Sequence, residues 1–149
     1  METMNHDFQE QAFMMRALLL SHQSLPACRP NPPVGCVLVK EGEIVSEGFT
    51  QPPGQHHAEA MALANYNGSF ADVTAYVTLE PCSFVGCTPS CAHTLVELGI
   101  KKVVVATLDP DSRNSGKGIA VLKEAGIEVE VGLCENEVLD FIEPYLIKN

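Results

Sequence analysis

The sequence of 149 residues contains no tryptophan and has few basic side chains. Its nine lysines and arginines are scattered along the chain and face 19 acidic residues, which gives a formal net charge of -10. A protein that follows a nucleic-acid backbone needs a clustered basic surface to neutralise phosphates, so a nucleic-acid partner is disfavoured. A surface of this charge is also repelled by anionic membranes.

Long hydrophobic runs are absent as well. No apolar segment approaches the roughly 20 residues that cross a bilayer. Glu2, Asp7 and Glu10 stand where a secretory signal would carry positive charge and an apolar run. The six cysteines are therefore interpreted as reduced thiols of a cytoplasmic protein rather than as a disulfide framework. No repeat, linker or low-complexity segment divides the chain, so we expect residues 1–149 to form a single domain.

Hydrophobic periodicity and turn residues predict alternating helices and strands. Apolar residues at helical spacing, with Asp7 and Glu10 placed like a capping box, predict a helix over residues 7–22. Further helices are expected at 58–66, 91–98, 118–125 and 135–146. Strands are expected at 34–40 and 43–49, joined as a hairpin, and at 73–79, 102–108 and 127–132. Pro144 should disturb the last helix. The expected fold class is α/β, a three-layer α/β/α sandwich with a five-stranded mixed sheet.

Three residues in the middle of the chain have the chemistry of a zinc site. His57 stands at the expected start of one helix, and Cys82 and Cys91 bracket the start of another. One imidazole and two thiolates leave the fourth position of a tetrahedral zinc ion open for water, as in catalytic zinc sites. The positive ends of two helices favour the thiolate form of the cysteines. The sequence therefore predicts that His57, Cys82 and Cys91 bind Zn2+.

Glu59 follows the metal histidine by two residues and is predicted to move protons rather than to bind the metal. A zinc-activated water and a glutamate that is not a ligand are the parts with which nucleobase deaminases replace an exocyclic amine. We therefore predict a zinc-dependent hydrolytic deaminase of a small amino-heterocycle, a hydrolase acting on the C–N bonds of cyclic amidines that releases ammonia.

The residues around this site resemble a known family. The matching stretches are Pro30-Asn31-Pro32, Val34-Gly35, His57-Ala58-Glu59, Tyr76 to Ser83, Thr88-Pro89 with Cys91, Asp109-Pro110, Gly116-Lys117-Gly118 and Ala125-Gly126-Ile127. They are similar to the cytidine-deaminase-like superfamily, and within it to the deaminase domains of riboflavin-biosynthesis pyrimidine deaminase/reductases. The resemblance implies a zinc cofactor, an aminopyrimidine substrate and a homodimer. It also implies that Asn31 hydrogen-bonds the substrate ring, and that Thr88 and Asp109 line the side that holds its ribosyl phosphate. The chain ends at Asn149, so no reductase domain is expected.

Several positions depart from the family pattern. The family usually has His at the positions of Thr50 and Phe84, Lys at that of Cys87, and Asn at that of Asp111. The lysine is a cation on the phosphate side, so its replacement by Cys87 removes a charge-assisted contact. Asp111 adds negative charge on the same side. These changes predict a substrate that carries no phosphate or holds it elsewhere.

Two other functions are compatible with the sequence. If the thiolate of Cys87 took the fourth zinc position, the site would be a closed Cys3His structural site in a protein without catalytic activity. Glu59 would then have no role, so the enzyme is the preferred interpretation. The third possibility is deamination of a base in RNA or DNA, which the charge of -10 and the lack of a basic aromatic strip disfavour.

Overall fold

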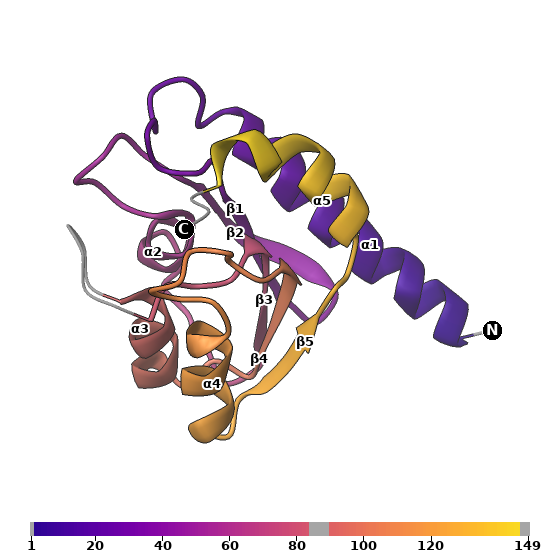
Figure 1. Ribbon diagram of the computed structural model, residues 1–149. Coiled ribbons are helices and arrows are strands. Elements are labelled where there is room, and N and C mark those ends of the chain that lie inside the picture. The colour runs from indigo at the N-terminus through magenta and orange to yellow at the C-terminus, as the bar shows by residue number, and fades with distance from the viewer. Residues whose placement is uncertain (1, 84–89, 147–149) are drawn as a thin grey trace.

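The computed structural model describes residues 2–83 and 90–146, with side chains from residue 8 onward, and Figure 1 shows their arrangement. The strands are β1 (Gly35–Lys40), β2 (Glu43–Phe49), β3 (Val73–Leu79), β4 (Lys102–Thr107) and β5 (Glu128–Val131). They form one sheet in the order β2-β1-β3-β4-β5. β1 runs antiparallel to β2 and β3, whereas β3, β4 and β5 are parallel to one another. The predicted five-stranded mixed sheet is confirmed.

Helices cover both faces of this sheet (Figure 1). They are α1 (Glu2–His22) and α5 (Glu135–Ile142) on one face, and α2 (Ala58–Ala64), α3 (Cys91–Leu98) and α4 (Lys117–Glu124) on the other. Side chains alternate along β1, so that Leu38 enters the core under α2, α3 and α4 while Val37 enters the core under α1 and α5. The ring of His22 stacks on that of Phe141 with 3.9 Å between centroids and joins α1 to α5. The three-layer sandwich is therefore confirmed.

The start of α1 and the end of α2 differ from the prediction. α1 begins at Glu2 rather than at residue 7, so Asp7 lies inside the helix and the predicted capping box is wrong. Residues 2–6 contain neither proline nor glycine, and nothing local stops the helix from extending. α2 ends at Ala64 rather than at residue 66. Tyr66 leaves the helix and places its ring edge-on to that of Phe70, with 5.2 Å between centroids.

Pro144 ends the last helix. α5 stops at Ile142, and the chain continues as a short 3-10 helix, η1 (Glu143–Tyr145). Proline has no N–H for the α-helical hydrogen bond, which explains why the predicted helix over 135–146 is shorter in the structure. The strands lie within one residue of their predicted ends.

Two glycines allow helices to lie close against the sheet. A Cβ at Gly35 would collide with the backbone carbonyl of Ala17 in α1, and a Cβ at Gly48 with that of Ala58 in α2. Ser46 Oγ also donates a hydrogen bond of 2.6 Å to the carbonyl of Ala62. β2 therefore fixes the position of α2, and with it the residues at the start of that helix.

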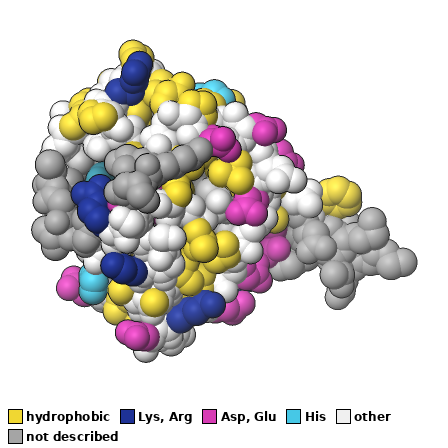
Figure 2. Space-filling view, in the orientation of Figure 1, with side chains coloured by type: hydrophobic (Ala, Val, Ile, Leu, Met, Phe, Trp, Pro, Cys, Tyr) yellow, Lys and Arg dark blue, Asp and Glu magenta, His cyan; other side chains and the backbone are white. Residues whose placement is uncertain are grey.

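Charged side chains are unevenly distributed on the surface. On the face shown in Figure 2, acidic side chains gather on one side, while lysines and arginines stand singly and form no strip. Within the described residues, no helix is both long enough and apolar enough to pass through a membrane.

Candidate metal centre

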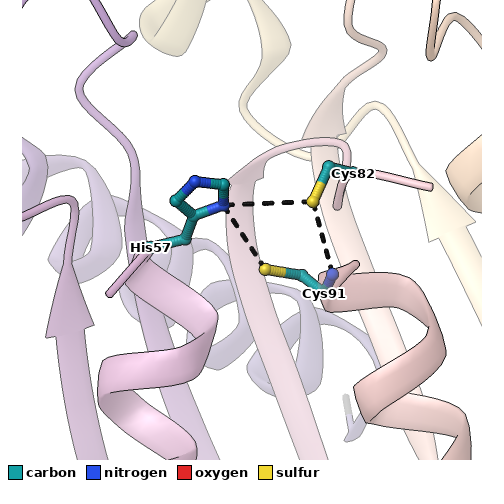
Figure 3. Close-up of side chains that lie close together, drawn as sticks. All are labelled: His57, Cys82 and Cys91. Atoms are coloured by element: carbon teal, nitrogen blue, oxygen red, sulfur yellow. Dashed lines mark hydrogen bonds between the residues drawn. The ribbon is translucent and has the colours of Figure 1, made fainter. Parts of the chain in front are cut away.

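The three predicted metal ligands meet at one end of the sheet. His57 immediately precedes α2 with an extended backbone, Cys82 follows the end of β3, and Cys91 is the first residue of α3. Figure 3 shows the imidazole and the two thiols turned toward one another. The carboxyl ends of the parallel strands β3 and β4 lie at this edge, which is where open α/β sheets bind their ligands.

The ligand atoms have the spacing of a tetrahedral zinc site. His57 Nδ1 lies 3.5 Å from Cys91 Sγ and 3.9 Å from Cys82 Sγ. Zinc–nitrogen and zinc–sulfur bonds of ordinary length put such atoms about 3.6 Å apart across a tetrahedral ion. All three ligand atoms lie within 4.8 Å of one another. The group therefore fits a zinc ion, with Nδ1 as the coordinating nitrogen of the histidine.

Hydrogen bonds favour the thiolate form of Cys82, which is the form that binds zinc. Its sulfur accepts a hydrogen bond of 3.3 Å from the backbone N–H of Cys91. A hydrogen bond from the Cys91 thiol, followed by one from His57, lowers the pKa of Cys82 to about 4. The same bond raises the pKa of the Cys91 thiol, which holds its proton against a neighbouring thiolate. A divalent cation bound by these atoms displaces such protons, because thiolate and neutral imidazole are the ligating forms.

Backbone contacts hold Cys82 against the start of α3. Its carbonyl accepts hydrogen bonds from Ser90 Oγ at 2.8 Å and from the N–H of Ala92 at 3.0 Å. Ser90 is the N-cap of α3, and its Oγ also accepts a hydrogen bond from the N–H of His93 at 3.4 Å. The two cysteines therefore share one hydrogen-bonded frame.

The carboxyl group of Glu59 is buried beside the metal ligands. Glu59 lies in the first turn of α2 and is 4% exposed. Burial, and next the charge of Cys82, raises the pKa of Glu59 to about 7, while the charge of His57 acts in the opposite direction. A carboxyl group with a pKa near neutrality can accept and release a proton under physiological conditions.

Comparison with known proteins agrees with this chemistry. Residues 8–107 match the family described as the cytidine and deoxycytidylate deaminase zinc-binding region. The chain belongs to this deaminase family. The predicted family, the zinc cofactor and the class of enzyme, a zinc deaminase that hydrolyses C–N bonds, are thereby confirmed.

Two relatives illustrate how the deaminase aligns. The riboflavin biosynthesis protein RibD of Haemophilus influenzae is 50% identical over 129 residues, which cover 87% of this chain and 35% of that protein. A Buchnera aphidicola protein named diaminohydroxyphosphoribosylamino-pyrimidine deaminase is 42% identical over 125 residues, covering 84% of this chain and 85% of that one. The chain thus spans about a third of the RibD relative and most of the Buchnera protein.

Two solved structures have the same fold. Acinetobacter baumannii RibD, form 1, superposes with a TM-score of 0.88 at 44% identity, over 93% of this chain and 39% of that chain. The Aspergillus oryzae Rib2 deaminase in complex with DARIPP superposes with a TM-score of 0.75 at 26% identity, over 93% and 92% of the two chains.

Of the three predicted substrate contacts, Asn31 and Asp109 are among the residues that the structure describes. Asp109 is half-buried after β4, and its Oδ1 accepts a hydrogen bond of 3.0 Å from the N–H of Asp111. Burial raises the pKa of the Asp109 carboxyl group. Asn31 is half-buried in the loop before β1. Thr88 and Cys87, and with them the closed-site alternative, lie outside the described residues, as does Phe84.

Sequence reasoning missed two buried residues that tie the loops of this site together. Glu80 is 3% exposed and precedes Pro81-Cys82, a position next to a metal ligand that could have drawn attention to it. Its carboxylate accepts backbone hydrogen bonds from Asp109 at 3.1 Å, Gly116 at 3.0 Å and Ile119 at 3.1 Å. The second residue, Asn114, is 0% exposed, and no local pattern in the sequence indicated it.

Proposed function

We propose that this deaminase acts on a pyrimidine that carries a ribosylamino phosphate, as named for the Buchnera relative, and replaces one ring amino group by oxygen. The observation that carries the proposal is the buried carboxyl group of Glu59 beside a Cys2His metal group. The 42% identity to that Buchnera protein, and the 50% identity to a protein named for riboflavin biosynthesis, support the substrate class. The homodimer and the single-domain organisation of residues 1–149 stay predictions.

The reaction consumes one water molecule and releases ammonia. A zinc ion held by His57, Cys82 and Cys91 would lower the pKa of a bound water molecule to about 7. The carboxylate of Glu59 would accept a proton from the attacking water as the water oxygen forms a bond to the ring carbon that bears the amino group. The carboxyl group of Glu59 then returns the proton to the departing nitrogen as the C–N bond breaks. The remaining hydroxyl proton moves to the adjacent ring nitrogen, so that a carbonyl group remains on the ring and Glu59 ends as it began.

The structure removes one argument for a phosphate-free substrate. Asp111 was expected to add negative charge on the phosphate side, but its carboxylate is 3% exposed and binds Arg113. Arg113 Nη2 donates to Asp111 Oδ2 at 2.6 Å, and the backbone N–H of Arg113 donates to Asp111 Oδ1 at 3.0 Å. The charge of Asp111 is therefore neutralised within its own loop. The Buchnera relative is named for a phosphoribosylamino pyrimidine, and we propose the phosphorylated form in place of the phosphate-free one.

Ammonia release by the zinc-loaded protein tests this function. The phosphoribosylamino pyrimidine and its dephosphorylated form are compared as substrates, and we expect clear preference for the phosphorylated one. Glu59→Gln keeps the size of the side chain but cannot accept the proton, so turnover should fall by about 100-fold or more. Glu97→Gln, an exposed change on α3, is the matched control and should keep full turnover. Equal turnover by the Glu59 variant would contradict the mechanism, and preference for the dephosphorylated compound would contradict the substrate.

A further inference from the structure

Asn114 lies on the loop between β4 and α4, and its side chain is fully buried. Its Oδ1 accepts hydrogen bonds from the backbone N–H of Ser83 at 3.0 Å and from Ser83 Oγ at 2.9 Å. Its Nδ2 donates to the carbonyl of Pro81 at 3.2 Å and, in a longer contact, to Asp109 Oδ2 at 3.4 Å. The amide thus uses both of its acceptor and both of its donor positions.

These hydrogen bonds hold the residues on both sides of the metal ligand Cys82. With Pro81 and Ser83 bound to one rigid amide, the backbone at Cys82 has little freedom to turn its sulfur away from the metal position. A shift would leave buried polar groups without partners, which is costly in a low-dielectric interior. The geometry points to Asn114 as a positioning residue that sets the orientation of Cys82 for metal binding.

The loop that carries Asn114 is itself fixed. The backbone N–H of Asn114 donates to the carbonyl of Asp111 at 2.9 Å. Gly118 lies in the first turn of α4, and a Cβ there would collide with the carbonyl of Pro81. α4 therefore packs directly against the residue that precedes Cys82. Because its own loop is held in place, Asn114 can keep Pro81 and Ser83 in fixed positions.

The contact with Asp109 extends this role toward the substrate. Nδ2 of Asn114 binds both Asp109 and Pro81, and Oδ1 binds Ser83, so one amide connects the predicted substrate contact to the two neighbours of the metal ligand Cys82. Only this last step rests on the proposed function. The positioning of Cys82 is independent of which molecule the enzyme deaminates.

Metal affinity measured without substrate tests the inference. We expect Asn114→Ala in the full chain to weaken zinc binding about 10- to 100-fold, measured by competition with a chromogenic chelator, because outer contacts of metal ligands have effects of this size. The cobalt-loaded variant should also show altered d–d absorption bands, since these report on the arrangement of the sulfur and nitrogen ligands. Val138→Ala, buried in the core on the other face of the sheet, is the control for loss of stability alone.

The outcomes separate positioning from a merely structural role. If Asn114→Ala and Val138→Ala lower the urea midpoint but leave zinc affinity and the cobalt bands unchanged, Asn114 does not position Cys82. Should Asn114→Ala fail to fold, Asn114→Ser takes its place, because a short hydroxyl retains a polar group but cannot reach both Pro81 and Ser83, and the same two criteria apply. A wrong substrate assignment leaves both readouts intact, so the two proposals can fail independently.

Discussion

Ser90 Oγ donates a hydrogen bond of 2.8 Å to the backbone carbonyl of Cys82. The same hydroxyl accepts the N–H of His93 and caps the helix that begins at Cys91. One side chain therefore joins the two metal cysteines and closes the amino end of α3. Its loss should affect the helix and the metal centre together.

The first prediction concerns this hydroxyl. Ser90→Ala removes the N-cap and the contact to the Cys82 carbonyl, and we expect it to lower the free energy of unfolding by about 1–2 kcal/mol. Zinc affinity should fall as well. Urea unfolding and chelator competition measure the two effects. Thr94→Val is the matched control, because Thr94 Oγ1 donates to the carbonyl of Ser90 at 3.1 Å at the start of the same helix. Its expected change is below about 0.5 kcal/mol, and an equal loss in both variants would rule out a special role for Ser90.

Metal removal should destabilise the folded protein. A ligand that binds only the folded state stabilises it by about 2.7 kcal/mol at 100 times its dissociation constant. We therefore expect zinc to raise the melting temperature and a chelator to reverse the rise. His57→Ala and Cys82→Ser should remove most of this response, since each deletes one of the three ligands that the structure brings together.

Two other cysteine variants test which thiols bind the metal. Cys28→Ser changes a free, buried cysteine outside the metal group and should keep the zinc response, although its fold is weakened. Cys87→Ser distinguishes an open site from a closed one. Retention of zinc binding and of ammonia release by this variant is the expected result, whereas loss of the metal would favour the Cys3His structural site.

The stability of the fold should also depend on pH through one pair on the surface. Arg16 binds Glu47 through two hydrogen bonds, of 2.6 and 2.9 Å, and these lower the pKa of the Glu47 carboxyl group below its ordinary value. The carboxylate is thus favoured by folding, so the stabilisation is complete above pH about 5 and is lost as the pH falls through the lowered pKa.

The test is the difference in unfolding free energy between the natural chain and Glu47→Gln. The side chains of Arg16 and Glu47 are 40% and 31% exposed, so we expect less than about 1 kcal/mol near pH 7. The difference should vanish in strong acid and shrink in about 1 M salt. A difference that grows as the pH falls would show that the pair acts with the opposite sign.

The sequence predicted what depends on short-range patterns. The spacing of His57 and Glu59 places both at the start of one helix, and Cys82 follows a strand whose apolar run is unmistakable. Zinc chemistry then restricts how these side chains can meet. The start of α1 was wrong because a capping box is only one way for a helix to begin, and nothing in residues 2–6 prevents further turns.

Contacts between distant loops could not be predicted in this way. Asn114 and Ser83 are 31 positions apart and meet only because the parallel strands β3 and β4 end side by side. A single asparagine in a polar loop is usually solvated, and only its complete burial shows that its amide is used on both edges. Asp111 and Arg113 are only two positions apart, but their pairing depends on how the loop folds. The sequence alone therefore did not show that the negative charge of Asp111 is neutralised.

Glu80 offers the last prediction, since its carboxylate is the common acceptor for the loop after β4 and the start of α4. Glu80→Gln leaves one oxygen for three backbone N–H donors and turns an NH2 group toward the others. We expect a loss of about 2–3 kcal/mol in urea unfolding, because hydrogen bonds to a charged acceptor are the stronger ones. Glu97→Gln, the exposed equivalent on α3, should change stability by less than about 0.5 kcal/mol. Equal effects of the two changes would mean that the carboxylate of Glu80 does not hold these elements in place.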